Sequence, residues 1–426
     1  MPVELPSALG AVFPQKVGRR GFVGRLLAAS GLVLASARAR AQETDLLPPG
    51  VPPWSREQGA GVLSPPYGLP SFFERAVVRK PREKPLFPTA ASTGTPLQSL
   101  HGIVTPNGLH YERHHAGVPA IDPDQHRLMV HGLVERPLIF TLDELMRFPS
   151  VSRLHFLECS GNTPQWKKIE PLWTVQDSHG LLSCAEWTGV RLADVLGEAG
   201  IQPAARWLLA EGADAALMTR SVPLAWALEE GILAYAQNGE RLRPEQGYPL
   251  RLLLPGFEGN VNVKWLRRLK LVEGPMESRE ETSKYTDLLP GGTARQFAFT
   301  MEVKSVITTP SGGQALGPPG FHEIRGLAWT GRGRIRAVEV STDGGGSWQQ
   351  AQLQEPILSK CLTRFRLPWH WDGGPTRLMS RATDETGTVQ PTRDRLIELR
   401  GANGRYHYNA IQSWQIAAGG AVSNAG

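Results

Sequence analysis

Residues 155–162 read HFLECSGN, an apolar strand-like run that ends in an acid, a cysteine and Ser-Gly-Asn. Cys159 is the first of only three cysteines in a chain of 426 residues. Gly161 and Asn162 tolerate unusual backbone angles, so the strand can turn sharply after Cys159 and leave its thiol at a strand end, facing a cleft. A cysteine after an apolar strand is most often a small core residue, but a thiolate at a strand end can also be a nucleophile or a metal ligand.

Short apolar runs on both sides of this stretch indicate a domain of strands and short helices. Between about residues 96 and 274 they alternate with two helical patterns, TLDELMRF and RLADVLGEAG. Thr141 and Glu144 have the spacing of a capping box, and Gly200 is placed as a C-terminal helix glycine. We therefore expect a mixed α+β domain over residues 96–290.

Further along the chain, from about Phe297 to Arg400, the pattern changes to alternating strands broken by Gly and Asp. This pattern predicts an immunoglobulin-like β-sandwich over residues 291–400, followed by a C-terminal tail at 401–426. No repeat of roughly 20 to 50 residues is found, so a solenoid or a propeller is not expected.

The first part of the chain has the features of an export signal. Residues 1–41 contain twin arginines, Arg19 and Arg20, then a mildly apolar run and an Ala-Arg-Ala ending. The apolar run is about half of the roughly 20 residues that a membrane span needs, so we expect no membrane anchor. Twin-arginine signals commonly accompany proteins that fold around a cofactor before export, so we expect a periplasmic location and a cofactor. Residues 42–95 are rich in Pro and are predicted to form an extended arm.

The excess of positive charge belongs mainly to this signal. Residues 1–41 hold six of the 46 basic residues and one of the 40 acidic residues, so the rest of the chain has a net charge of +1. A nucleic-acid partner is therefore not expected.

The cysteines do not form a disulfide framework. Cys184 and Cys361 could form a bridge that leaves Cys159 free, and the sequence leaves this pairing open. There is no CxxCH motif, so we expect no c-type haem on this chain.

The surroundings of Cys159 resemble the sulfite oxidase family of molybdenum enzymes, in which a strand-end cysteine before small-Gly-Asn supplies a thiolate to molybdenum. The resemblance covers nearly all of residues 100–400 and follows the family's order of motifs. The motifs are NGLHYERHHAGVP (107–119), LECSGN (157–162), EWTGVRLADVL (186–196), EQGYPLRLLLPG (245–256) and NVKWLRRLKLVE (262–273).

The later part of the chain resembles the dimerisation domain of the same family, through VEVSTDGGGSWQQAQL (338–353) and the Trp-x-Trp pair at Trp369 and Trp371. The twin-arginine signal, the residues around Cys159 and the ending RYHYNAIQSW (405–414) are similar to the molybdenum subunits of periplasmic sulfur-oxidising (Sox) sulfane dehydrogenases.

The resemblance implies a molybdenum–molybdopterin cofactor and a set of site residues. Cys159 would ligate the metal, Arg113 would bind the negative oxygens of the substrate, and Tyr285 would donate a hydrogen bond or relay a proton. The residues that match the family's cofactor contacts are His115, Asp214, Gln246, Arg251, Asn262, Val263 and Lys264.

Three positions depart from the family pattern. Thr163, Pro164 and Gln165 stand where sulfite-oxidising relatives have a pair of arginines, Gln246 replaces a histidine, and His114 replaces an asparagine. Loss of charge beside the metal disfavours a small dianion and favours sulfur presented covalently, such as a persulfide on a sulfur-carrier protein.

Several functions remain open. A two-electron oxidation on a chain without haem implies a separate c-type cytochrome, in an assembly that is either a homo-oligomer or a hetero-oligomer with that cytochrome. The candidates for its binding surface are the Pro-rich arm and the predicted tail with Tyr406, Tyr408 and Trp414. The alternatives are a dehydrogenase for free sulfite, a reductase for an oxyanion such as nitrate, and a non-catalytic binding or assembly subunit.

Overall fold

The computed structural model describes residues 68–81, 89–166, 168–402 and 404–426. The predicted signal peptide and most of the predicted Pro-rich arm lie outside these residues. The chain divides into two units at Phe72, and the architecture below is that of residues 73–426. Among the described residues, no helix is both long enough and apolar enough to cross a membrane.

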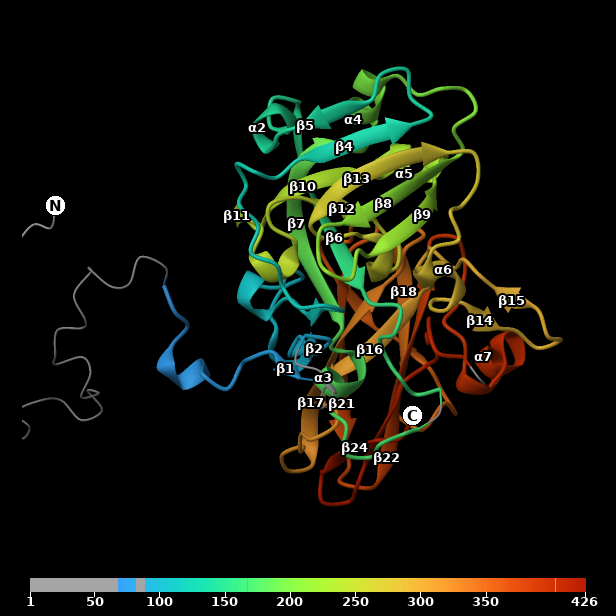
Figure 1. Cartoon of the computed structure of the whole chain (residues 1–426). Helices are drawn as coiled ribbons and strands as arrows, with labels where there is room; N and C mark the ends of the chain where they lie inside the picture. The colour runs from blue at the N-terminus through green and yellow to red at the C-terminus, as the bar shows by residue number, and fades with distance from the viewer. Residues whose placement is uncertain (1–67, 82–88, 167, 403) are drawn as a thin grey trace, which may run out of the picture. The chain divides into compact units, whose positions relative to one another are not determined.

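Two five-stranded sheets form the first domain (Figure 1). One is antiparallel, with β12 added on β10, and the other is mixed because β13 runs parallel to β4. The first contains β6 (Ser150–Glu158), β7 (Leu182–Arg191), β10 (Ile232–Gln237), β11 (Glu240–Arg241) and β12 (Arg251–Leu253). The second contains β4 (Leu128–Gly132), β5 (Leu138–Phe140), β8 (Trp207–Gly212), β9 (Thr219–Pro223) and β13 (Leu266–Val272).

Short helices and small strands complete this domain. The predicted capping box of Thr141 and Glu144 begins α2, and Gly200, with a φ of 72°, ends α4. The α-helices are α2 (Leu142–Leu145), α3 (Val175–His179), α4 (Leu192–Ala199), α5 (Leu224–Glu230) and α6 (Arg279–Thr282). The 3-10 turns are η2 (Phe72–Glu74), η3 (Leu97–Ser99), η4 (Asn107–Leu109), η5 (Pro244–Gln246) and η6 (Gly259–Val261). The small strands are β1 (Lys80–Pro81), β2 (Ser92–Gly94), β3 (Glu112–Arg113), β14 (Asp287–Leu288) and β15 (Ala294–Arg295).

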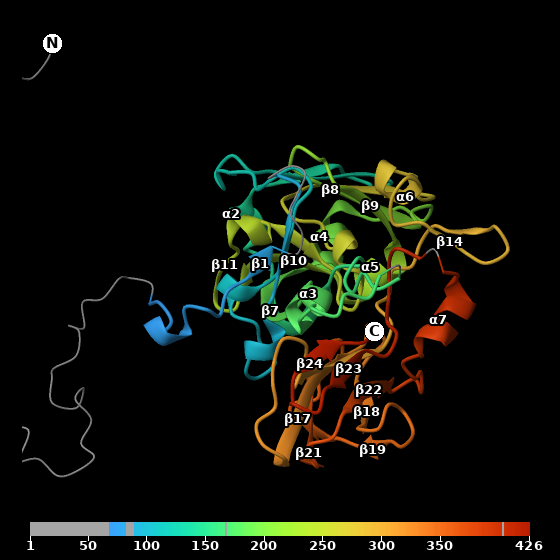
Figure 2. The same ribbon diagram turned by 90° about the horizontal axis from the view of Figure 1, so that it is seen from below.

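The second domain is a sandwich of two antiparallel sheets, which confirms the predicted α+β domain followed by an immunoglobulin-like sandwich (Figure 2). One sheet contains β16 (Lys304–Thr309), β17 (Gly320–Trp329), β20 (Gln352–Gln354) and β21 (Thr363–Trp371). The other contains β18 (Ile335–Ser341), β19 (Gln349–Gln350), β22 (Thr376–Asp384), β23 (Ser413–Ile416) and β24 (Val422–Asn424), and α7 (Arg393–Arg400) lies beside it.

The predicted C-terminal tail is not a separate segment. Strand β23 pairs with β22 and β24 pairs with β23, so residues 413–424 extend a sheet of the sandwich. Tyr408 and Trp414 are 2% and 0% exposed, and their rings are therefore not available to a partner. The expectation that these two aromatics bind a cytochrome is wrong, because their apolar surface is used inside the fold.

One apolar core crosses the boundary between the two domains. Phe156 and Leu182 of the first domain pack in the same cluster as Trp329 and Trp414 of the sandwich. Cys184 and Cys361 face each other in this cluster as free thiols, with their sulfur atoms 3.3 Å apart. The two domains therefore share buried surface.

A buried ion pair lies beside this shared core. The Lys304 ammonium group donates to Glu158 Oε1 at 2.9 Å and to Thr163 Oγ1 at 2.7 Å. The indole of Trp329 donates to Glu158 Oε2 at 2.6 Å. Glu158 ends β6 and precedes Cys159, so two side chains of the sandwich fix the strand end of the first domain.

Replacing Lys304 with Met should lower the free energy of unfolding by about 3–5 kcal/mol, because it leaves the Glu158 carboxylate buried without its cation. The control is Arg136→Met, whose ion pair with Glu198 is solvent-exposed and should contribute less than about 1 kcal/mol. Urea denaturation followed by tryptophan fluorescence measures both changes. Equal losses in the two variants would contradict a stabilising role for the buried pair.

Candidate functional site

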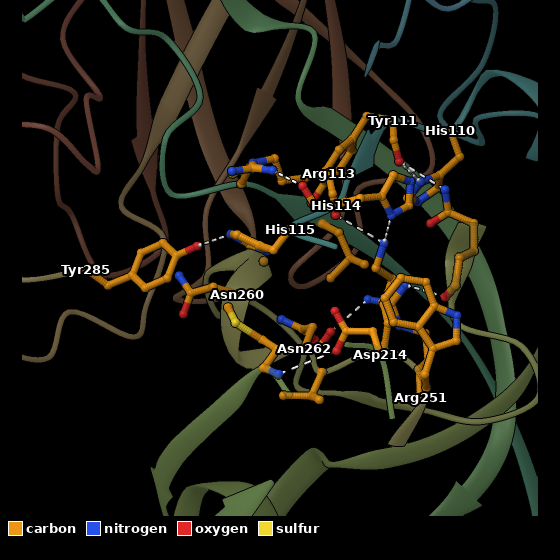
Figure 3. Close-up of a pocket in the computed structure, with 18 residues that line it drawn as sticks. His110, Tyr111, Arg113, His114, His115, Asp214, Arg251, Asn260, Asn262 and Tyr285 are labelled. Atoms are coloured by element: carbon orange, nitrogen blue, oxygen red, sulfur yellow. Dashed lines mark hydrogen bonds between the residues drawn. The ribbon is translucent and has the colours of Figure 1, made fainter. Parts of the chain in front are cut away.

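The residues that the sequence predicts for the site gather in one pocket (Figure 3). Its walls come from β3, β12, η6 and the loops after β6 and β8, which are far apart in the sequence. The predicted residues that line it are Arg113, His115, Cys159, Asp214, Gln246, Arg251, Asn262, Val263, Lys264 and Tyr285.

The turn after β6 holds the Cys159 thiol at the pocket, where the residue is half-buried. The Cys159 amide donates to Leu181 O at 3.0 Å, and the Asn162 amide donates to Cys159 O at 2.8 Å. The Asn162 side chain donates to Glu158 Oε1 at 2.9 Å and accepts from the Leu181 amide at 3.1 Å. The Asn162 side chain therefore stabilises the turn through these two hydrogen bonds.

The backbone of this turn differs from the expectation in one respect. Neither Gly161 nor Asn162 has a positive φ, whereas Thr163 has a φ of 59°. The glycine that the turn does require is Gly259, on the facing loop. A Cβ atom there would lie 2.8 Å from the Tyr111 hydroxyl and 3.3 Å from Cys159 Cα.

Arg251 is a buried cation whose position is fixed by the protein. Its guanidinium donates to Gln246 O at 3.0 Å and to Asn262 O at 3.1 Å, and it stacks 4.9 Å from the centre of a Trp187 ring. Burial lowers the pKa of Arg251 to about 10, which leaves it charged at neutral pH.

Lys264 is a second cation in the pocket. Its ammonium group donates to Arg113 O at 3.1 Å and to Glu245 O at 3.0 Å, and it lies 3.0 Å from His114 Nδ1. Because Lys264 donates to Nδ1, the proton of a neutral His114 is on Nε2, which then donates to Glu112 at 2.8 Å. Burial, together with the charge of Arg251, lowers the pKa of Lys264 to about 7, so an anionic ligand would favour its protonated form.

Tyr285 lies opposite this cationic wall, with its hydroxyl 3.5 Å from His115 Nε2 (Figure 3). The Arg220 guanidinium lies 5.1 Å from the centre of its ring, and the Tyr406 ring lies 5.0 Å away. Burial, and then the nearby Cys159, raise the pKa of Tyr285, so the phenol remains protonated at neutral pH. It can therefore donate a hydrogen bond to an oxygen in the pocket.

The residues that replace the family's arginine pair do not line the pocket. Thr163 and Gln165 are 1% and 0% exposed. Thr163 accepts from Lys304, and Gln165 donates to Gln412 Oε1 at 2.8 Å. Their side chains bond to the second domain and add no charge to the pocket. Of the described lining residues, those with lysine or arginine side chains are Arg113, Arg251 and Lys264.

Several lining residues were not predicted as site residues. His110 and Tyr111 belong to the motif NGLHYERHHAGVP, which also contains the predicted site residues Arg113 and His115. Their closeness in sequence to these two residues was a usable signal. Met218 and Asn260 had no such signal, because their approach to the pocket depends on how the loop after β8 and the turn η6 fold. The other lining residues outside the prediction are His114, Leu157, Gly259 and Trp265.

Comparison with known proteins agrees with this geometry. The family model for the oxidoreductase molybdopterin binding domain matches residues 115–280, and that for the Mo-co oxidoreductase dimerisation domain matches residues 295–414. The sulfite oxidase of Gallus gallus is 35% identical over 314 residues, which are 68% of this chain and 68% of that protein. The chain belongs to the sulfite oxidase family.

Other members of the sulfite oxidase family match over different extents. The mitochondrial sulfite oxidase of Drosophila melanogaster is 30% identical over 358 residues, which cover 77% of this chain and 62% of that protein. This chain thus spans less than two thirds of the Drosophila protein. The crystal structure of the sulfane dehydrogenase SoxCD from Paracoccus pantotrophus matches with a TM-score of 0.86 and 46% identity, over 88% of this chain and 97% of that chain.

The pocket of this family member fits a molybdenum–molybdopterin cofactor. Within the described part of the chain, three buried polar atoms of lining residues have no hydrogen-bond partner: His110 Nε2, Arg251 Nε and Asn260 Oδ1. Buried polar atoms require partners, and a pterin with its phosphate offers both donors and acceptors. The Cys159 thiolate would hold the metal, and these groups together with Lys264 would hold the organic part.

His110 should make the protein sensitive to acid. Its ring is 1% exposed, and burial lowers its pKa to about 3 from an ordinary 6.5. Between these values the unfolded chain binds a proton that the folded chain does not, so stability falls as the pH is lowered from about 6.5 towards 3. When the pH is lowered from about 7 to about 5, the unfolding free energy of the His110→Gln variant should therefore decrease less than that of the parent protein.

Denaturant titrations at several pH values measure this difference. The exposed residue His370 supplies the control, since His370→Gln should follow the parent. A His110→Gln variant with the parent's pH dependence would show that His110 is not the group responsible.

Proposed function

We propose that this chain is the molybdenum-bearing subunit of a periplasmic sulfane dehydrogenase, exported by the twin-arginine route. It oxidises sulfane sulfur carried on the cysteine of a carrier protein and passes the electrons to a c-type cytochrome. One observation carries the proposal: the pocket has the family's cysteine, arginine and tyrosine but lacks the arginine pair next to the cysteine.

The likeness to the Paracoccus sulfane dehydrogenase supports this choice of substrate, since 46% identity extends over 97% of that chain. The charge of the pocket supports it as well. A free sulfite dianion calls for several cations near the metal, but Thr163 and Gln165 are neutral and bond to the second domain. Sulfur on a carrier brings less charge and is positioned by its protein.

The cofactor would supply two-electron chemistry with exchange of an oxygen atom. Arg113 would bind the negative oxygens that develop on sulfur, because its planar guanidinium offers several donors to anionic oxygens. The neutral Tyr285 phenol would donate to one of these oxygens, with His115 beside it at 3.5 Å to share the proton. Arg251 and Lys264 are held by backbone carbonyls, so they would bind the cofactor rather than the substrate.

The overall step is balanced by water and an electron acceptor. When a persulfide R–S–S⁻ takes one oxygen from water, it yields R–S–SO⁻, two protons and two electrons. We expect no haem on this chain, so a cytochrome c subunit would accept the electrons. The match to the Paracoccus SoxCD structure supports a hetero-oligomer with a partner subunit.

The test uses molybdenum-loaded protein, its cytochrome and two substrates, namely free sulfite and a persulfide on a cysteine-bearing carrier. We expect cytochrome reduction at least about tenfold faster with the carrier persulfide than with sulfite. Cys159→Ser should lose turnover and its molybdenum, measured per mole of protein by elemental analysis. Cys361→Ala removes a buried thiol outside the pocket and should retain both.

A sulfite dehydrogenase is the second candidate, because Arg113 lines the pocket and the relatives include the sulfite oxidases of Gallus gallus and Drosophila melanogaster. Fast turnover with free sulfite and none with the carrier would establish this alternative. Wild-type protein that lacks stoichiometric molybdenum would instead support a binding or assembly subunit. In that case Cys159→Ser should change neither the metal content nor the turnover.

A further inference from the structure

The segment between α7 and β23 lies against the turn that holds Cys159, although the two are about 250 residues apart in sequence. The His407 amide donates to Ser160 O at 2.8 Å, directly after Cys159. The Trp166 indole donates to Tyr406 O at 3.2 Å. These two bonds attach residues 406–407 to the loop that follows Cys159, at Ser160 and at Trp166.

The His407 side chain reaches a second wall of the same pocket. Its Nε2 lies 3.0 Å from Glu258 Oε2, and Glu258 is 1% exposed. The same carboxylate oxygen accepts from Asn260 Nδ2 at 2.7 Å. Asn260 lines the pocket and also donates to Ser160 Oγ at 3.1 Å. His407, Glu258, Asn260 and Ser160 thus form a closed ring of hydrogen bonds beneath the turn.

Glu258 also connects this ring to Tyr285. Arg220 lies 3.4 Å from Glu258 Oε1, and its guanidinium lies 5.1 Å from the centre of the Tyr285 ring. Tyr406, the neighbour of His407, has its ring 5.0 Å from that of Tyr285. The segment therefore contacts Tyr285 directly and Cys159 through the adjacent Ser160.

The backbone at His407 indicates that this arrangement is enforced. Its φ is 55°, a conformation that side chains other than glycine adopt at a cost unless their surroundings require it. A histidine bonded through both its amide and its ring is held in that conformation by Ser160 and Glu258.

We propose that His407 is a positioning residue of the active site, which fixes the Cys159 turn through Ser160 and Glu258. It does not touch the substrate, and the identification of Cys159 as the metal ligand rests on the proposed function. The second domain thereby supplies part of the geometry of a pocket whose lining residues all belong to the first.

Two substitutions that differ by one methylene group test the proposal. His407→Gln places an amide nitrogen as many bonds from Cα as Nε2 is, so it can still donate to Glu258. His407→Asn keeps a polar residue that tolerates positive φ, but its amide is one bond shorter. Tyr408→Phe is the control in the same segment, because its ring packs edge-on against Trp166, outside the pocket.

The first measurement is the alkylation rate of Cys159 in native, cofactor-free protein, which needs no assumption about activity. Iodoacetamide is the probe, and peptide mass spectrometry separates Cys159 from the buried Cys184 and Cys361. We expect His407→Asn to react about threefold faster or more, while His407→Gln and Tyr408→Phe remain near the wild-type rate, because access and thiolate fraction govern the reaction.

The second measurement uses molybdenum-loaded protein. For His407→Asn we expect kcat to fall about tenfold with KM changed less than about twofold, together with an altered Mo(V) electron paramagnetic resonance signal. His407→Gln should recover most of the kcat.

An unchanged alkylation rate in His407→Asn would overturn the role of His407. Wild-type protein that binds no molybdenum would count against the proposed function instead, and the alkylation result would still decide the role of His407.

Discussion

The carboxylate of Glu158 is the group on which the arrangement of the site depends. It accepts from Lys304 and Trp329 of the sandwich and from Asn162 of its own turn, at distances of 2.6 to 2.9 Å. A fully buried carboxylate needs such partners to offset its lost hydration. Because Cys159 is the next residue, the requirement to satisfy one buried charge also sets the place of the thiol.

The basic side chains that would bind the cofactor are also held in place before any ligand binds. Backbone carbonyls fix the positions of the Arg251 guanidinium and the Lys264 amino group. Such preorganised charge favours an anion without a further cost of rearrangement. Arg113 and Tyr285 are on the other side, where hydrogen bonds to substrate oxygens would form (Figure 3).

Local patterns of strands and helix starts predicted both domains, whereas the main site residues followed from the resemblance to the sulfite oxidase family. Asn162 can be recognised beside Cys159, and Thr141 with Glu144 marks a helix start, since these contacts span only a few residues. The prediction missed Asn260 and His407, whose positions depend on loops that meet only in the folded chain. It also misjudged Tyr408 and Trp414, because an aromatic residue near the C-terminus gives no local sign of being buried.

The shared core has a consequence for the order of events during synthesis. The groups that brace the Cys159 turn, such as Lys304, Trp329 and His407, belong to the last third of the chain. A ribosome makes them after every residue that lines the pocket has been made. The nascent first domain thus lacks the contacts that fix its thiol. Stable enclosure of a cofactor there must wait until the sandwich has emerged from the ribosome and folded against the first domain.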